Sequence, residues 1–171
     1  MPRYVAFLRG VSPMNVRMAD LRGCFEAAGY SNVVTVLSSG NVVFDARGAA
    51  NAMLEKKAEA AMAHGLDRAF ATIVRPVGHL ERLLEGNPYA SFDIAPAAKR
   101  IVTFLRRPTP PALNLPVAMD GATILCVIGL EVYSAYVPGP KGPVFMSLIE
   151  RTFGKDVTTR TLETVRKCAA A

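Results

Sequence analysis

VLSSGNVVF, residues 36–44, places a short polar link between two apolar, β-branched runs. The runs cover residues 33–37 and 42–44, and the Gly-Asn pair in the link is the strongest hairpin signal in the chain. This stretch therefore predicts two antiparallel strands joined by a turn.

The segments on either side of the hairpin are predicted to form further helices and strands. The predicted elements are a strand at 4–8, a helix at 18–28, the two hairpin strands, a helix at 53–62 and a strand at 69–74. Gly29 and Gly65 are the predicted caps of the two helices. The order strand, helix, strand, strand, helix, strand predicts a ferredoxin-like alpha-beta plait, in which two helices cover one face of a four-stranded antiparallel sheet.

The second half predicts a looser copy of this plait. Its predicted elements are a helix around 80–84, strands at 100–105, 123–128 and 132–137, a helix at 145–153, a short segment at 157–159 and a helix at 162–168. A proline-rich passage at 108–116 stands where a plait would have its first helix. We therefore expect an α+β protein of two packed alpha-beta plait subdomains with antiparallel sheets, at residues 1–76 and 77–171, with a boundary near Pro76 or Pro88.

Three predicted strands, 4–8, 33–37 and 124–128, are apolar at nearly every position. A sheet with one wet face should alternate apolar and polar residues, so both faces of these strands are expected to be buried. Helices of the same half cover only one face. The other face is expected to be covered by the second half or by another subunit, as in a homodimer.

The charge balance favours anionic partners. The 171 residues include 20 Lys and Arg against 14 Asp and Glu, which gives a net charge of +6. This charge favours a small anionic molecule or a nucleic acid, and solubility alone is the alternative interpretation. Three isolated cysteines predict neither a disulfide framework nor a zinc site. Without a signal peptide or an apolar run of about 20 residues, we expect a cytoplasmic protein with no membrane partner.

Recognised catalytic motifs are absent from the sequence. It contains no Walker-type phosphate loop, dinucleotide glycine pattern, nucleophile elbow or histidine pair at metal spacing. The sequence therefore predicts no metal and no cofactor, and it leaves catalytic residues unassigned. The two histidines, His64 and His79, are expected at helix ends in structural or surface roles.

Three polar loops are the candidate ligand sites. RGVSPMN, residues 9–15, leads from a strand to a helix N-terminus, where backbone N–H groups and Arg9 can bind an anion. The hairpin link offers hydroxyl groups and glycine backbone, and DVTTRTLETVRK, residues 156–167, places Arg160 beside the last helix with Thr159 or Thr161 as its cap. For each loop the alternative is a purely structural connection, turn or cap.

Basic dipeptides offer a further anion-binding feature. They are Lys99-Arg100, Arg106-Arg107 and Arg166-Lys167. They can hold nucleic acid if the fold brings them together; otherwise they are solvated residues, with Arg106-Arg107 protecting a strand end against edge pairing. The strands lack the stacking aromatic residues that an RNA-recognition plait displays.

Four motifs occur together in a specific order: YVAFLRG at 4–10, SSGNVVF at 38–44, NPY at 87–89 and TTR…TVRK at 158–167. Across essentially the whole chain they resemble the bacterial family called domain of unknown function 1697. The resemblance implies two alpha-beta plait subdomains and no established activity. It also places Arg9, Gly10, the Ser-Gly-Asn of the hairpin and Arg160 in the family pattern.

The chain departs from that family pattern in two places. Residues 11–15, VSPMN, stand where the family usually has a glycine pair followed by Lys-Asn. Thr161 and Leu162 stand where it usually has Asn and Trp, and the chain contains no Trp. The resemblance implies that any ligand contact made by those family residues is lost or altered here.

The leading hypothesis is a non-catalytic protein that binds a small anion, a nucleotide or a nucleic-acid phosphate. The candidate binding residues are Arg9, Gly10, Asn15, Ser39, Gly40, Asn41 and Arg160. We expect the loop before the first helix and the hairpin link to lie at opposite ends of a plait sheet, so that these residues meet only across the two halves or across a dimer.

Two alternatives from other classes remain. One is an enzyme that acts on a small phosphorylated or carboxylated substrate. It would need a base, namely His79, Asp20 or Glu163, within hydrogen-bond reach of Ser38, Ser39 or Thr159. The other is a structural or oligomerising module, in which the polar loops are only turns.

Overall fold

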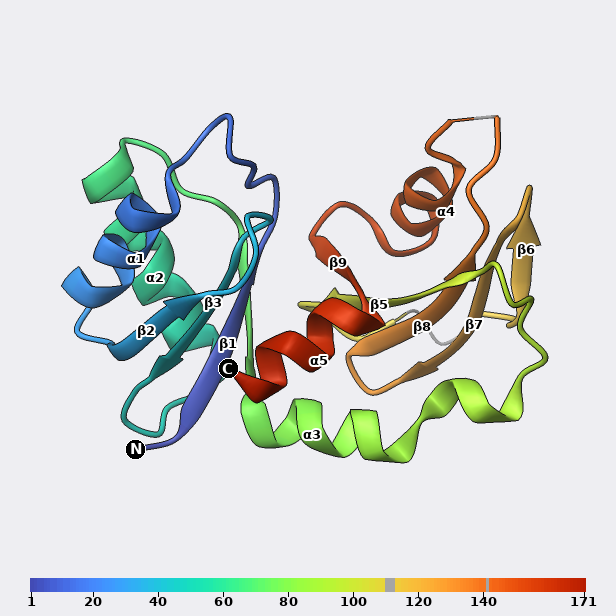
Figure 1. Cartoon of the computed structure of the whole chain (residues 1–171), viewed down its shortest axis with the longest axis horizontal. Coiled ribbons are helices and arrows are strands. Elements are labelled where there is room, and N and C mark those ends of the chain that lie inside the picture. The colour runs from blue at the N-terminus through green and yellow to red at the C-terminus, as the bar shows by residue number, and fades with distance from the viewer. Residues whose placement is uncertain (110–112, 141) are drawn as a thin grey trace. The chain divides into compact units, whose positions relative to one another are not determined.

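The computed structural model describes residues 1–109, 113–140 and 142–171. They form an α+β protein with one four-stranded and one five-stranded antiparallel sheet, which confirms the predicted fold class (Figure 1). The chain divides into two compact units, residues 1–85 with 166–171 and residues 86–165. No helix in the described part of the chain is both long and apolar enough for a membrane span. The division into subdomains at residues 1–76 and 77–171 stays a prediction.

The first unit is an alpha-beta plait. Its elements are β1 (Arg3–Leu8), α1 (Met18–Ala27), β2 (Ser31–Thr35), β3 (Asn41–Asp45), α2 (Asn51–Leu66), β4 (Thr72–Pro76) and α3 (Val77–Gly86). The strands have the order β2-β3-β1-β4. Helices α1 and α2 pack against each other, α1 also against β2 and α2 against β4 (Figure 1). The predicted order of elements is therefore confirmed in this half.

The strand register corrects one expectation about the loops. β1 and β3 are antiparallel neighbours, and Phe7 near the end of β1 pairs with Asn41, the first residue of β3. The chain enters β3 from the hairpin link, so this link meets the end of β1. The loop after β1 and the hairpin link therefore lie at the same end of the sheet, and the expectation of opposite ends is wrong.

Burial of the strands follows the prediction only in part. β1 is buried from Tyr4 to Leu8, on both of its faces. Val34 in the edge strand β2 is 43% exposed, Leu37 in the link after β2 is 50% exposed, and Ile128 at the end of β7 (Ala122–Ile128) is 57% exposed. The prediction of two buried faces is therefore wrong for those positions. Covering of a sheet face by the second half or by another subunit stays a prediction.

The second unit repeats the strand order of the plait, but different helices pack against its sheet. Besides β7, its elements are a 3₁₀ turn (Pro88–Ser91), β5 (Lys99–Leu105), β6 (Val117–Met119), β8 (Glu131–Tyr136), α4 (Val144–Phe153), β9 (Val157–Thr161) and the start of α5 (Leu162–Ala170). The sheet order is β6-β7-β8-β5-β9. Its last four strands repeat the β2-β3-β1-β4 order of the first unit. Among the described residues no helix lies between β5 and β7, and α4 packs against β6 and β7.

One helix boundary differs from the sequence prediction, and another agrees with it. Gly65 does not cap α2, because the helix continues to Leu66 and ends at Asp67, which has a φ of 53°. A Cβ atom on Gly65 would lie 3.0 Å from the Cys24 sulfur, so the glycine allows α1 and α2 to approach closely. At α5, the Thr161 hydroxyl accepts a hydrogen bond from the Thr164 backbone N–H (3.2 Å), which confirms Thr161 as the cap.

Candidate functional site

The hairpin link at residues 36–41 has a clear structural role. The buried Asn41 side chain donates from Nδ2 to the Val36 carbonyl (2.9 Å) and to the Ser39 hydroxyl (3.1 Å). Gly40 has a φ of +89°, and its carbonyl accepts a hydrogen bond from the Leu8 backbone N–H (2.8 Å). The glycine and the amide therefore fix the turn and attach it to β1, whether or not a ligand binds there.

The loop after β1 also uses most of its polar groups internally. Asn15 donates to the Gly10 carbonyl (2.7 Å), and its own Oδ1 accepts from the Ser12 N–H (2.9 Å). The backbone N–H groups of Met14, Asn15 and Val16 donate to Ser12. This loop therefore offers fewer donors to an anion than the sequence indicates, and its role in binding stays a prediction.

Arg160 belongs to the second unit and lies on β9, where it pairs with Val102. Its guanidinium donates to the Thr158 hydroxyl and to the Thr159 carbonyl, both at 2.7 Å. The strand position follows from the pairing of residues 157–161 with β5, which extends the predicted short segment. Arg160 is therefore held by its own strand rather than by the N-terminus of α5, and its part in ligand binding stays a prediction.

The basic dipeptides do not form one surface along β5. Lys99-Arg100 begins this strand and Arg106-Arg107 follows its end, so five residues separate the two dipeptides, and Arg100 and Arg106 lie roughly 20 Å apart along the strand. β5 lies between β8 and β9, so its end needs no protection against edge pairing. The suggested edge-protecting role of Arg106-Arg107 is therefore wrong.

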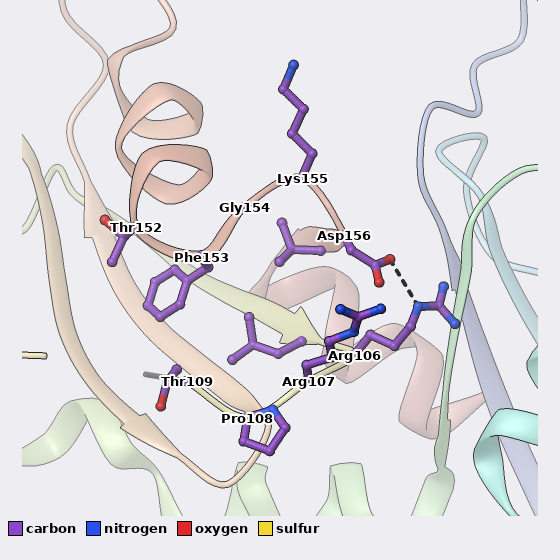
Figure 2. A pocket seen from close by; sticks show the side chains of 11 residues that line it. Arg106, Arg107, Pro108, Thr109, Thr152, Phe153, Gly154, Lys155 and Asp156 are labelled. Atoms are coloured by element: carbon purple, nitrogen blue, oxygen red, sulfur yellow. Dashed lines mark hydrogen bonds and ion pairs between the residues drawn. The ribbon is translucent and has the colours of Figure 1, made fainter. Parts of the chain in front are cut away.

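Arg106 and Arg107 instead line a cavity of about 380 Å³ in the second unit, which we call the β5-end cavity (Figure 2). Residues 105–109 and 152–157 line it. The register creates it, because Leu105 at the end of β5 pairs with Val157 at the start of β9. The segment after β5 is thereby placed beside the link from α4 to β9.

The residues that line the β5-end cavity carry more positive than negative charge. The Arg106 Nε donates to an Asp156 carboxylate oxygen at 3.0 Å, and both side chains are partly exposed. The exposed Arg107 makes no hydrogen bond or ion pair with any described residue. Lys155 extends away from the Arg106–Asp156 pair in Figure 2. Three cationic side chains therefore accompany one carboxylate.

A second cavity, of about 350 Å³, lies in the first unit and includes Asn15. Arg17 and Arg68 line it together with Asp20. The Arg68 guanidinium lies over the Phe70 ring, 4.6 Å from its centroid, and a cation stacked in this way already has an attractive partner. This cavity therefore has less uncompensated positive charge than the β5-end cavity.

Register places Arg9 and Arg106 in equivalent positions of the two units. Each follows a Phe-Leu pair at the end of the first plait strand, at residues 7–8 and 104–105. The Leu8 N–H donates to the carbonyl just before β3, and the Leu105 N–H to the carbonyl just before β8, both at 2.8 Å. The repeated Phe-Leu-Arg marks the two equivalent strand ends in the sequence, and the predicted binding residue Arg9 is the counterpart of Arg106.

Two thiols and one hydroxyl group bear on the enzyme alternative. Burial, and secondarily the Asp20 charge, raises the pKa of Cys24, and burial raises the pKa of Cys126, so both thiols stay protonated near neutral pH. The Thr159 hydroxyl lies 3.6 Å from the Met146 sulfur. In the described part of the chain, no cluster of three His, Cys, Asp or Glu residues could hold a metal ion. The enzyme alternative stays a prediction.

Comparison with known proteins places the chain in a family. Residues 1–122 match the family described as "Protein of unknown function (DUF1697)". No curated protein matches the chain. A solved structure, the conserved bacterial protein SP0830 from Streptococcus pneumoniae, has a TM-score of 0.71 and 22% identity, covering 99% of this chain and 97% of that chain. At this identity the likeness concerns the fold alone. This chain is a member of the DUF1697 family, as its four sequence motifs predict.

Proposed function

We propose that this protein binds a small phosphorylated or carboxylated anion in the β5-end cavity. The observation that carries the proposal is Arg107, whose guanidinium lines the cavity and pairs with no described residue. An arginine presents a planar set of N–H donors that matches two oxygens of a phosphate or carboxylate. This geometry supports the binding of an anion.

An anion that binds to Arg106 has to compete with the carboxylate of Asp156. Its carboxylate already occupies one side of that guanidinium, at 3.0 Å. The pair is partly exposed, so it is worth about 0–1 kcal/mol and can be exchanged for a ligand oxygen. An incoming anion therefore gains a full partner in Arg107 and shares Arg106 with Asp156.

The dimensions of the site favour a small ligand over a nucleic acid. A volume of about 380 Å³ lies within the usual range of small-molecule sites. Nucleic-acid binding would need basic side chains distributed along a surface, whereas the two dipeptides of β5 lie at opposite ends of the strand. A small anion is therefore the ligand class that the cavity supports best.

Calorimetric titration with inorganic phosphate tests the proposal. Arg107→Ala removes a charge-assisted hydrogen bond worth about 1.5–3 kcal/mol, so the Kd should rise about 10- to 100-fold. Arg151→Ala is the matched control, since Arg151 is an exposed arginine of α4 outside the cavity and contacts the Met119 sulfur. Equal affinities of Arg107→Ala and the unaltered protein would refute the proposal.

The same titrations also test two of the binding residues that were predicted from the sequence alone. Arg9→Ala and Arg160→Ala are titrated beside Arg107→Ala. A loss of affinity confined to Arg107→Ala supports the β5-end cavity alone. A loss confined to Arg9→Ala or Arg160→Ala moves the site to the loops that the sequence singled out.

A further inference from the structure

The β5-end cavity has two chemically different sides. Arg106 and Asp156 form its charged side, whereas Phe153 and Pro108 lie away from this ion pair in Figure 2. Leu105, which is buried, contributes apolar lining. A ligand that fills the cavity therefore meets charge and apolar surface together.

Phe153 is held in place by the end of α4. It is the last residue of this helix, and Gly154, with a φ of +86°, follows it. The Gly154 N–H donates to the Glu150 carbonyl at 2.8 Å and closes the final turn. The partly buried ring packs against the core of the second unit and lines the cavity, and it contacts no other aromatic ring among the described residues. A positioned ring of this kind can stack on a planar ligand group.

The cavity is larger than one anionic group requires. At about 30 Å³ for each water molecule of a liquid, 380 Å³ corresponds to about a dozen water-sized groups. A phosphate group fills only a part of this volume. The remaining room fits one flat ring attached to the anionic group.

We infer that the ligand is a small aromatic anion, in which one aromatic or heteroaromatic ring carries a phosphate or carboxylate. The anionic group meets Arg107 and Arg106, and the ring packs against Phe153. An aryl phosphate, an aryl carboxylate and a nucleoside monophosphate share this chemistry. The inference rests on the proposed function, since it assumes that Arg107 binds the anion.

Three matched probe pairs test the ring in calorimetric titrations of the full chain. Phenyl phosphate is compared with inorganic phosphate, benzoate with acetate, and uridine monophosphate with ribose 5-phosphate. We expect the ring-bearing member of at least one pair to bind about tenfold more tightly, a gain within the range measured for stacking on an aromatic side chain. The pair that shows the gain identifies the source of the ring and of the anionic group.

Variants of Phe153 test recognition of the aromatic ring separately from binding of the anion. Phe153→Leu keeps apolar volume and should abolish the tenfold advantage without changing phosphate affinity, while Phe153→Tyr should retain the advantage. Equal affinities within all three pairs for the unaltered protein would overturn the aromatic ligand and leave anion binding intact. If Arg107→Ala changes no affinity, or if no probe binds, the proposed function itself fails.

Discussion

Gly40 is the position where one added methyl group should cost the first unit most. Its φ of +89° is a conformation that costs other L-residues about 1–2 kcal/mol. A Cβ atom there would also lie 2.9 Å from the Val11 Cβ and 3.0 Å from the Leu8 Cβ. These atoms are fixed to the backbone, so the overpacking should add about 1–3 kcal/mol. We expect Gly40→Ala to lower the free energy of unfolding by about 2–5 kcal/mol.

Two other glycines separate the conformational cost from the steric cost. Gly10 has a φ of +85°, and a methyl group added there would meet no atom within 4 Å, so Gly10→Ala should cost only about 1–2 kcal/mol. Gly23 lies inside α1 with open space around it, and Gly23→Ala should stabilise the protein by about 0.5–1 kcal/mol. Urea unfolding followed by far-ultraviolet circular dichroism measures all three. Equal costs for Gly40→Ala and Gly10→Ala would refute the steric argument.

Titration and capping provide three shorter tests. Hydrogen bonds from Asn32 and then Arg3 lower the pKa of Asp45, so their stabilisation is present above the unfolded pKa of about 3.9 and is lost as the pH falls through the folded pKa. Asp45→Asn should flatten the acid limb of stability against pH, and an unchanged limb contradicts this. Burial raises the pKa of Tyr30 to about 12, so stability should fall as the pH rises from about 10 to 12, and Tyr30→Phe should remove the absorbance transition near pH 12. Thr161→Ala should cost about 1 kcal/mol in urea unfolding, whereas Thr161→Ser should retain the cap.

The first unit is predictable from sequence because its signals are local. Apolar residues at helical spacing fix α1, and the Gly-Asn link fixes the hairpin. The end of α2 is mispredicted because Gly65 is a glycine for a non-local reason, the approach of the Cys24 sulfur from α1. A glycine that permits close packing and a glycine that ends a helix look the same in sequence.

Strands that depend on distant partners are harder to predict. β6 has three residues and exists through its pairing with β7, from Val117 opposite Ile124 to Met119 opposite Ala122. β9 extends to Thr161 because it pairs with β5. β6 is too short for apolar alternation to be visible, and β9 has one apolar residue, Val157, followed by four polar ones.

The sequence indicates the arginines of the candidate site but not the cavity that they line. The Arg106-Arg107 pair is evident there as a basic dipeptide, but the cavity depends on the register that joins Leu105 to Val157. The structure also shows that Asn15 and Asn41 use their amides to close their own loops. A sequence identifies polar residues in loops, whereas the hydrogen-bond partners of their side chains depend on how each loop folds.

The equivalence of the two units gives a last prediction, on Asp156. The Arg9 N–H donates to the Ala71 carbonyl beside β4, and Asp156 is the residue that corresponds to Ala71 beside β9. The second unit thus carries a carboxylate next to its arginine where the first unit has a methyl group.

Asp156→Ala gives the second unit the residue that the first unit has at this position, and it removes a negative charge beside the anion. Two unit charges about 4 Å apart interact by about 1 kcal/mol in water, so phosphate affinity should increase about fivefold. Calorimetric titration measures the gain, and Arg107→Ala should abolish it in the double variant. If Asp156→Ala binds phosphate no better than the unaltered protein, Asp156 does not compete with the anion and the site does not include Arg106.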